Sequence, residues 1–351
     1  MDFAPNVEQR DCRDTARGYL TGRYPAAVVA EIADSAAGLR PADWAPLIEL
    51  GWFDPAMDLV TQALLAEQSG YVLHPVPWWQ TLALLPVAGG QSPLAFAWYD
   101  DECRTLADAC RSSGVRAEST ADGWLISGSK DLVPDAATAE RVVLTATAGD
   151  GVALFALPAG GDGVTITPLR SLDGLRRAAR VDCADAPAQL LLPAGPATRD
   201  VIGLLRRRLL TLLAAEAVGV AARAVDLAAA HARVRTQFGR PIGEFQGVAF
   251  RVADSVLALE LARTLAYRAA WLVERGEPDA AGTAVACALL AGRDAATAAC
   301  EHAMQILGGI AMTWEHPVHR WYRRALWLRA FDAPSATYED DIALTLLGPV
   351  G

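Results

Sequence analysis

Residues 235–246 read RTQFGRPIGEFQ and separate two long stretches of helical periodicity. Apolar and small side chains recur at three- and four-residue intervals over residues 199–235 before this segment and over 245–275 after it. Glycine and proline inside the segment interrupt that pattern, as is typical of a tight connection between helices. The segment therefore predicts a short loop between two helices of a bundle.

Two further stretches complete the C-terminal part of the chain. The helical pattern continues over residues 279–307 and 317–331, and Pro278 precedes the first of them. Pro317 fits the first turn of the last helix, where a missing N–H removes no hydrogen bond. Four long apolar-striped helices joined by short loops predict a four-helix bundle over residues 196–351.

The N-terminal residues 1–92 predict a small all-α domain. Short helical runs alternate with Gly, Pro and Asp, as at Gly51 and at Asp54 with Pro55. These runs cover residues 11–20, 26–36, 41–50 and 57–69.

Residues 93–195 change to a period of two, which predicts β-strands. Gly- and Asp-rich turns separate the strands, and only residues 101–112 have a helix-like pattern. The expected strands cover residues 123–128, 141–145, 152–157 and 164–167. Short strands at this spacing predict a compact antiparallel sheet or barrel. The predicted fold is therefore mainly α with a central β domain, in the order α–β–α.

The composition narrows the class of protein. Hydrophobic residues make up 52% and charged residues 21% of the 351 residues, which is a globular profile. A net charge of -10 argues against a nucleic-acid binder, which needs a basic surface. The chain has no secretory leader pattern, and no apolar stretch reaches the roughly 18 residues of a membrane span. Six scattered cysteines without a CxxC pair predict reduced thiols in a cytoplasmic protein, and no metal site is expected.

Three segments resemble the acyl-CoA dehydrogenase family. Residues 235–246 resemble that family's R-x-Q-F-G-[KR]-x-[IL]-x-x-[FY]-Q loop, and QILGGI at 305–310 resembles its Q-x-x-G-G-x element. Residues 313–325 resemble the helix that follows. The resemblance covers the whole chain in outline and about residues 205–330 in detail. It implies an N-terminal helical domain, a middle β domain and a C-terminal four-helix bundle.

The same resemblance implies an FAD site. An arginine before a Phe-Gly turn offers fixed positive charge and backbone donors to a diphosphate, and a glycine pair lets the backbone approach a cofactor closely. In this family these elements reach the FAD of the neighbouring subunit. The residues implied as FAD contacts are Arg235, Gln237, Phe238, Gln246, Gln305, Gly308 and Gly309.

The family's reaction is the α,β-dehydrogenation of an acyl thioester. A carboxylate removes the α-proton while the β-hydride moves to flavin N5. One branch carries its base, a Glu, in a Y-E-G turn, and alignment through Arg323 and Ala325 places Asp332 there. Aspartate is one methylene shorter, although a nitroalkane-oxidising branch uses Asp at this position. The alternative is that Asp332 only begins a C-terminal turn.

Glu216 is the second candidate base. Another branch of the family carries its Glu on the first bundle helix, at a position that corresponds to about Leu209 here. Leu209 cannot act as a base, but Glu216 follows two turns later on the same stretch. Glu216 is either catalytic or a buried, paired carboxylate.

The β region departs from the family pattern. A Y-x-x-T-E-P-x-x-G-S-D segment usually bonds the flavin ring, but here the strand over residues 94–99 runs into Asp100, Asp101 and Glu102. A later G-x-K-x-W-I-T-N element becomes GSKDLVPD at 128–135, which loses the Trp and Thr that cover the flavin. The half of the site that serves a neighbour's FAD is therefore present, and the half that holds the chain's own FAD is eroded.

This asymmetry is typical of a β-type subunit in a heterotetramer, as in actinobacterial steroid side-chain dehydrogenases of the family. The implied partners are an acyl-CoA or acyl-carrier-protein thioester of lipid metabolism, an electron-transfer flavoprotein as electron acceptor, and identical or paralogous subunits in a tetramer. Three functions stay open. The chain is a dehydrogenase alone or as half of a heteromer, a flavin oxidase or monooxygenase, or a non-catalytic subunit that completes a paralogue's FAD site.

Overall fold

The computed structural model describes residues 4–348, apart from the side chain of Asp279. Contacts divide the chain into two compact units, each built from segments that are distant in the sequence. The helical unit comprises Met1–Glu31, Asp58–His74 and Leu210–Gly351, and the barrel unit comprises Ile32–Met57 and Pro75–Leu209. Helix α2 (Ala26–Asp34) crosses the first boundary, and the long helix α6 (Pro196–Val234) crosses the last.

The N-terminal helices of the helical unit have well-formed caps. Helix α1 (Val7–Arg23) begins at a capping box, in which Asn6 and Gln9 satisfy each other's backbone N–H groups. Asp58 caps α4 (Leu59–Val72) by accepting a hydrogen bond from the backbone N–H of Thr61. Almost every residue of α4 is buried, because it packs on α1 and α7 and has no solvent-facing stripe.

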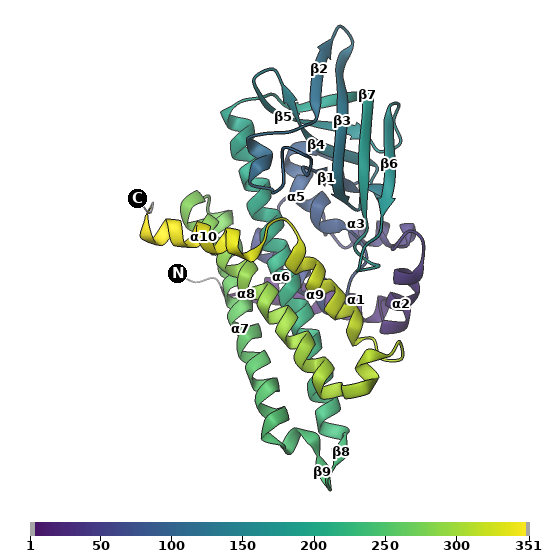
Figure 1. Cartoon of the computed structure of the whole chain (residues 1–351), viewed down its shortest axis with the longest axis vertical. Helices are drawn as coiled ribbons and strands as arrows, with labels where there is room; N and C mark the ends of the chain where they lie inside the picture. Colours follow the sequence, from purple (N-terminus) through teal and green to yellow (C-terminus); the bar gives the residue numbers. More distant parts are fainter. Residues whose placement is uncertain (1–3, 349–351) are drawn as a thin grey trace. The chain divides into compact units, whose positions relative to one another are not determined.

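Helix α6 and the three long helices after it form the predicted bundle, in which successive helices run antiparallel (Figure 1). They are α7 (Gln246–Glu274), α8 (Pro278–Leu307) and α9 (Val318–Ala330). The structure confirms the helical C-terminal region and adds α10 (Ser335–Leu347), which packs on α8 and was not predicted.

Two glycines bring α4 and α6 into backbone contact. A Cβ at Gly70 would lie 2.0 Å from the carbonyl oxygen of Glu216, and a Cβ at Gly219 would lie 1.9 Å from that of Glu67. Real Cβ atoms do not approach so closely, so both positions require glycine. The contact is reciprocal, and it fixes α4 against the bundle.

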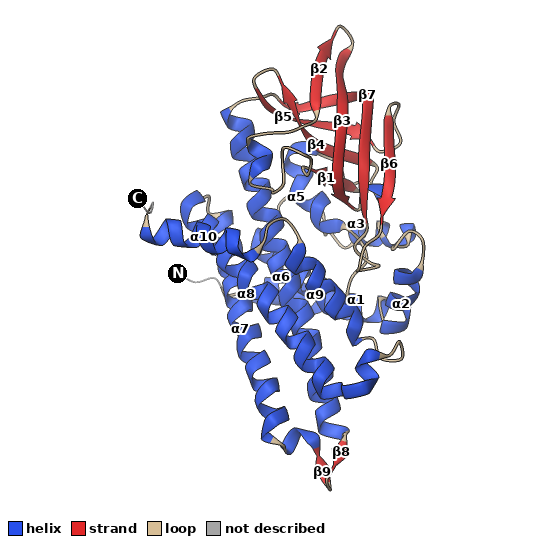
Figure 2. Cartoon of the chain, in the orientation of Figure 1, coloured by secondary structure: helices blue, strands red, loops and turns tan. Residues whose placement is uncertain are grey.

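The middle of the barrel unit is a closed β-barrel, drawn in red in Figure 2. Neighbouring strands are hydrogen-bonded in the order β4-β2-β3-β7-β5, and β5 pairs back to β4. The β4–β2 pairing is parallel and the others in the ring are antiparallel. Outside the ring, β1 pairs with β4 and β6 pairs with β7. The strands are β1 (Leu94–Ala97), β2 (Arg116–Thr120), β3 (Gly123–Pro134), β4 (Arg141–Ala148), β5 (Gly151–Pro158), β6 (Val164–Leu169) and β7 (Ala178–Leu192).

Some predicted elements were wrong or incomplete. The helix-like pattern over residues 101–112 is a loop with one short 3-10 turn, η2 (Asp108–Cys110). Its backbone follows side-chain hydrogen bonds instead of a helix, because Asp100 accepts from the N–H of Cys103 and Asp108 accepts from that of Thr105. The run over 41–50 is a 3-10 turn, η1 (Pro41–Asp43), followed by the short α3 (Ala45–Glu49).

Helix α5 (Trp78–Ala88) and strands β2 and β7 had no predicted counterpart. Pro86 lies inside α5, and Asp185 in β7 has a left-handed φ of 52°. Both features interrupt the local pattern on which sequence-based assignment depends. Among the residues that the structure describes, no helix is long and apolar enough to cross a bilayer.

Candidate functional site

The α6–α7 and α8–α9 connections lie at the same end of the bundle in the helical unit (Figure 1). The first is a two-stranded hairpin of β8 (Thr236–Gln237) and β9 (Arg240–Pro241). Its two central residues, Phe238 and Gly239, have φ values of 52° and 82°. A phenylalanine in this region carries strain of about 1–3 kcal/mol, and such strain concentrates at binding sites.

The hairpin side chains are exposed and make few contacts within the described part of the chain, where Arg240 pairs with Glu244 at 3.9 Å. Phe238 is 93% exposed, and its ring meets Phe245 edge-on at 6.1 Å. The guanidinium of Arg240 lies 4.2 Å from the centroid of Phe245. Arg235 is exposed and has no ion-pair partner among the described residues. Gln237 donates only to the adjacent carbonyl of Thr236, at 2.7 Å.

The second connection forms a pocket of about 320 Å³ where α8 ends and the 3-10 turn η5 (Gly308–Met312) begins. Gly308 has a φ of 68°, and no atom lies within 4 Å of a Cβ built at Gly308 or Gly309. The glycine backbone is therefore open to a ligand. The lining residues are Glu301, Met304, Gln305, Gly308, Gly309, Met312 and Tyr322.

The structure gathers most of the predicted FAD contacts at this end. Gln305 and the glycine pair share the pocket, Arg235 and Phe238 belong to the hairpin, and Gln246 is the first residue of α7. Sequence reasoning missed Glu301, Met304, Met312 and Tyr322. Glu301 could have been found, because it lies four residues before Gln305 and therefore one helical turn away on the same face.

Asp332 lies elsewhere, in the turn between α9 and α10. It lies ten residues after the pocket residue Tyr322 on α9, a length of about 15 Å along the helix. Asp332 is half-buried with a φ of 65°, and the hydroxyl of Tyr338 donates a hydrogen bond to its carboxylate. Fully buried Arg293 donates to the carbonyl oxygens of Phe331 and Ala333 on either side. The turn is therefore held rigidly from inside the helical unit.

Glu216 is engaged inside the bundle. Its side chain accepts a hydrogen bond from the guanidinium of Arg324 on α9, and both residues are buried. Removing either member of such a pair leaves an uncompensated buried charge, which costs about 3–5 kcal/mol. This geometry matches the paired-carboxylate alternative for Glu216.

In the barrel unit, Asp100 and Lys130 form a buried ion pair, each about 1% exposed. Lys130 Nζ lies 2.6 Å from Asp100 Oδ2, 2.9 Å from Ser113 Oγ and 3.0 Å from Thr145 Oγ1. Burial alone would raise the pKa of Asp100, but the Lys130 ammonium and the surrounding donors outweigh it and hold that pKa below its usual value. Asp100 therefore points into the protein, where it pairs with Lys130.

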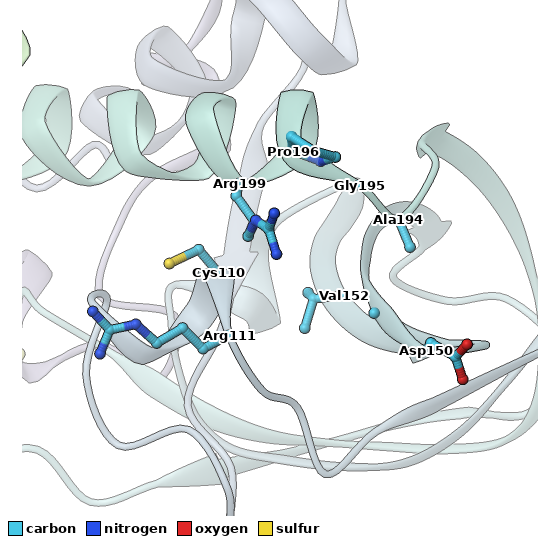
Figure 3. A pocket seen from close by; sticks show the side chains of 9 residues that line it. Cys110, Arg111, Asp150, Val152, Ala194, Gly195, Pro196 and Arg199 are labelled. Atoms are coloured by element: carbon cyan, nitrogen blue, oxygen red, sulfur yellow. The ribbon is translucent and has the colours of Figure 1, made fainter.

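A second pocket, of about 470 Å³, lies in the barrel unit between η2, the β4–β5 turn and the start of α6. Arg199 projects into it from α6, whereas the side chain of Arg111 leads away from it (Figure 3). None of the predicted site residues lines this pocket. Among the described residues, no three His, Cys, Asp or Glu side chains are placed to hold a metal ion.

Comparison with known proteins agrees with this architecture. The family model described as acyl-CoA dehydrogenase, C-terminal domain, matches residues 204–347. A probable acyl-CoA dehydrogenase of Bacillus subtilis, YngJ, is 31% identical over 281 residues, which are 75% of this chain and 71% of YngJ. The chain belongs to the acyl-CoA dehydrogenase family.

Two further similarities extend this picture. Acyl-CoA dehydrogenase FadE34 of Mycobacterium tuberculosis is 37% identical over 216 residues, which are 58% of this chain but only 29% of FadE34. The chain thus matches less than a third of that relative's length. The crystal structure of the ChsE4–ChsE5 complex from Mycobacterium tuberculosis matches with a TM-score of 0.86 over 100% of both chains, at 22% identity. At this identity the match shows a shared fold.

Proposed function

We propose that this chain is one subunit of an FAD-dependent acyl-CoA dehydrogenase and that its bundle end completes the FAD site of a neighbouring subunit. The observation that carries the proposal is a set of exposed side chains at that end that make few contacts with the rest of the described chain. Arg235, Phe238 and Gln305 are exposed, and Phe238 lies in the strained turn of the hairpin that follows Arg235. In such an enzyme, FAD accepts the hydride from the β-carbon of an acyl thioester.

The bundle end fits the cofactor. Arg235 offers fixed positive charge and a planar set of donors to a diphosphate. The open space beside Gly308 and Gly309 lets a ligand approach the backbone directly. The side-chain amide of Gln305 borders the same pocket and can donate or accept a hydrogen bond.

The end of β1 does not fit a flavin held by this chain itself. A flavin ring there would need free donors, but the Lys130 ammonium already has Asp100, Ser113 and Thr145 as acceptors. Asp100 in turn accepts from the backbone N–H groups of Glu102 and Cys103, both at 2.9 Å. We therefore favour a heteromer in which a paralogue supplies the flavin-binding β domain. The similar ChsE4–ChsE5 structure is itself a complex of two different chains.

Both candidate bases are engaged within this chain. Tyr338 donates to Asp332, and Arg324 donates to Glu216. A general base needs a carboxylate within hydrogen-bond reach of the proton that it removes. We therefore assign the proton abstraction to the partner subunit and a turn-forming role to Asp332. The partner's reduced flavin would pass its electrons to an acceptor such as an electron-transfer flavoprotein.

The test is the FAD content of the purified chain, alone and co-expressed with a paralogous acyl-CoA dehydrogenase. We expect no flavin on the chain alone and one FAD for every two chains in the complex. Arg235→Ala is expected to lower the FAD content of the complex, whereas exposed Arg233→Ala is the matched control and leaves it unchanged. One FAD per chain together with dehydrogenase activity in the isolated chain would refute the proposal.

Asp332→Asn distinguishes a turn-forming role for Asp332 from a role as the catalytic base. If Asp332 only shapes the turn, turnover by the assembled complex changes less than about two-fold. If it is the base, turnover falls by about 100-fold or more, because positioned general bases contribute on that scale. Acyl-CoA-dependent reduction of an artificial electron acceptor measures both outcomes.

A further inference from the structure

The pocket in the barrel unit carries opposite charges on its two sides. The guanidinium of Arg199 on α6 and the carboxylate of Asp150 in the β4–β5 turn both line it, and Figure 3 shows them on opposite sides. Both residues are exposed, and neither side chain has a hydrogen bond or an ion pair among the described residues. Because the two groups do not pair with each other, both charges are available to a ligand.

Arg199 is the cation that reaches into this pocket. Arg111 also lines it, but its side chain leads away (Figure 3). The first turn of α6 contains no acidic residue, and Asp200 does not face Arg199, because neighbouring residues of a helix point in different directions. A guanidinium stays protonated, and its planar fork of donors matches a carboxylate. This side of the pocket therefore suits a carboxylate.

The surface between the two charges is apolar. Val152 on β5 lies between Arg199 and Asp150 in Figure 3, and Ala194 and Pro196 also line the pocket. The start of β5 packs closely on the segment that leads into α6, because a Cβ built at Gly151 would lie only 3.2 Å from that of Ala194. The volume of about 470 Å³ is that of a small-molecule site, for which about 300–1,000 Å³ is usual.

The charge arrangement excludes simple ions as the preferred ligand. A phosphate that pairs with Arg199 would meet the like charge of Asp150, and a metal cation at Asp150 would meet that of Arg199. A ligand with both signs of charge, separated by apolar atoms, satisfies both sides of the pocket and its wall. Its two charged groups must stand apart, because Arg199 and Asp150 do.

We propose that this pocket binds a small zwitterion whose carboxylate and ammonium groups stand at opposite ends of a short apolar chain, as in an ω-amino acid. The carboxylate pairs with Arg199, the ammonium pairs with Asp150, and the methylene groups contact Val152. This site goes beyond the proposed function, because none of its residues belongs to the bundle end. Binding to the chain alone decides it, whereas the FAD content of the complex decides the proposed function.

Equilibrium dialysis of the purified full-length chain against radiolabelled 6-aminohexanoate measures the affinity. Hexanoate lacks the ammonium and hexylamine lacks the carboxylate. We expect each to compete about five-fold more weakly than 6-aminohexanoate, the upper end for a solvent-accessible ion pair. Glycine, whose two charges lie close together, is expected not to compete. Equal competition by hexanoate and 6-aminohexanoate, or no binding at millimolar concentrations, would overturn the assignment.

Variants of the two exposed side chains then identify each contact. Arg199→Gln is expected to weaken binding of 6-aminohexanoate about five-fold and to leave competition by hexylamine unchanged. Asp150→Asn is expected to make hexanoate compete as well as 6-aminohexanoate does. Arg116→Gln and Asp122→Asn, which are exposed in the barrel unit and lie outside the pocket, are the matched controls without effect. An equal loss in the control variants would show charge screening and contradict a specific site.

Cys110 reports whether the ligand occupies this pocket. Its side chain lines the pocket and is half-buried, as are those of Cys12 and Cys287 in the helical unit. Bound 6-aminohexanoate is expected to slow alkylation of Cys110 by iodoacetamide and to leave the other two thiols unchanged, as peptide mass spectrometry measures. Unchanged alkylation of Cys110 while dialysis shows binding would place the ligand elsewhere and overturn the assignment.

Discussion

Asp100→Asn tests whether the buried Asp100–Lys130 ion pair at the end of β1 stabilises the fold. The substitution keeps the shape of the side chain but removes the one carboxylate that, among the described residues, is bonded to the fully buried Lys130 ammonium. Losing the partner of a buried charge costs about 3–5 kcal/mol. Because Ser113 and Thr145 still accept hydrogen bonds from Lys130, we expect a value near the lower limit, about 3 kcal/mol.

Urea unfolding followed by tryptophan fluorescence measures this loss, because buried Trp98 also contacts Lys130 through its carbonyl oxygen. With a denaturant slope of about 3 kcal/mol per molar urea, the midpoint falls by about 1 M. Asp101→Asn is the matched control, because Asp101 is exposed and forms an exposed ion pair with Arg104, and we expect almost no change in midpoint. The double variant Asp100→Asn/Lys130→Met removes both charges and is expected to recover most of the loss.

The pH dependence gives an independent check. The pKa of Asp100 is lower in the folded chain than in the unfolded chain, because of the Lys130 ammonium and neighbouring donors. Its stabilisation is therefore complete above the unfolded pKa of about 4 and is lost as the pH falls through the folded value. The stability gap between the parent chain and Asp100→Asn should be constant above about pH 5 and shrink below it. An Asp100→Asn midpoint equal to that of the parent would refute the buried-pair argument.

Three other predictions follow from packing and burial. Gly219→Ala should lower the free energy of unfolding by about 3 kcal/mol, because its Cβ would lie 1.9 Å from the carbonyl oxygen of Glu67. Gly282→Ala on α8, where no atom lies within 4 Å of the added Cβ, should raise it by about 0.5–1 kcal/mol. Circular dichroism melts compare the two, and a similar loss for both would contradict the crossing geometry. Glu216→Gln should cost about 3 kcal/mol of stability but change turnover per folded complex less than about two-fold; a large loss of turnover at unchanged stability would make Glu216 the base. Burial raises the pKa of the Cys183 thiol to about 11, so iodoacetamide at pH 8 should not label it, as mass spectrometry would show, until urea unfolds the chain.

The helices of the bundle could be predicted because each one shows its own apolar periodicity in the sequence. The helical stripes on either side of residues 235–246 need only the sequence of each helix, and α6 and α7 follow them closely. Strand β7 was not predicted, because Asp185 within it adopts a left-handed conformation that breaks the alternation of side chains. Helix α5 was not predicted, because it contains Pro86 and is mostly buried, and therefore has no polar stripe.

In the candidate site, too, the residues of a local motif could be predicted and those brought in by tertiary packing could not. The motif predicted Gln305 and the glycine pair, which lie within one turn of each other at the end of α8. Tyr322 joins their pocket from α9, and only the packing of two helices brings it there. The sequence also shows Asp100 after the strand over residues 94–99, but it does not show its partner Lys130, which is 30 residues away and pairs with Asp100 only in the folded chain.

The burial of α4 has a consequence for synthesis on the ribosome. Part of the surface that covers α4 comes from residues after Leu210, including the backbone of Gly219 and the Arg263 side chain that pairs with Glu67. At about 5–20 residues per second, the roughly 140 residues between α4 and that surface take on the order of ten seconds to translate. During that interval α4 can pack on α1, but it lacks the part of its docking surface that the bundle supplies. Until the bundle emerges, the apolar surface of α4 that the bundle later covers is therefore a binding site for chaperones.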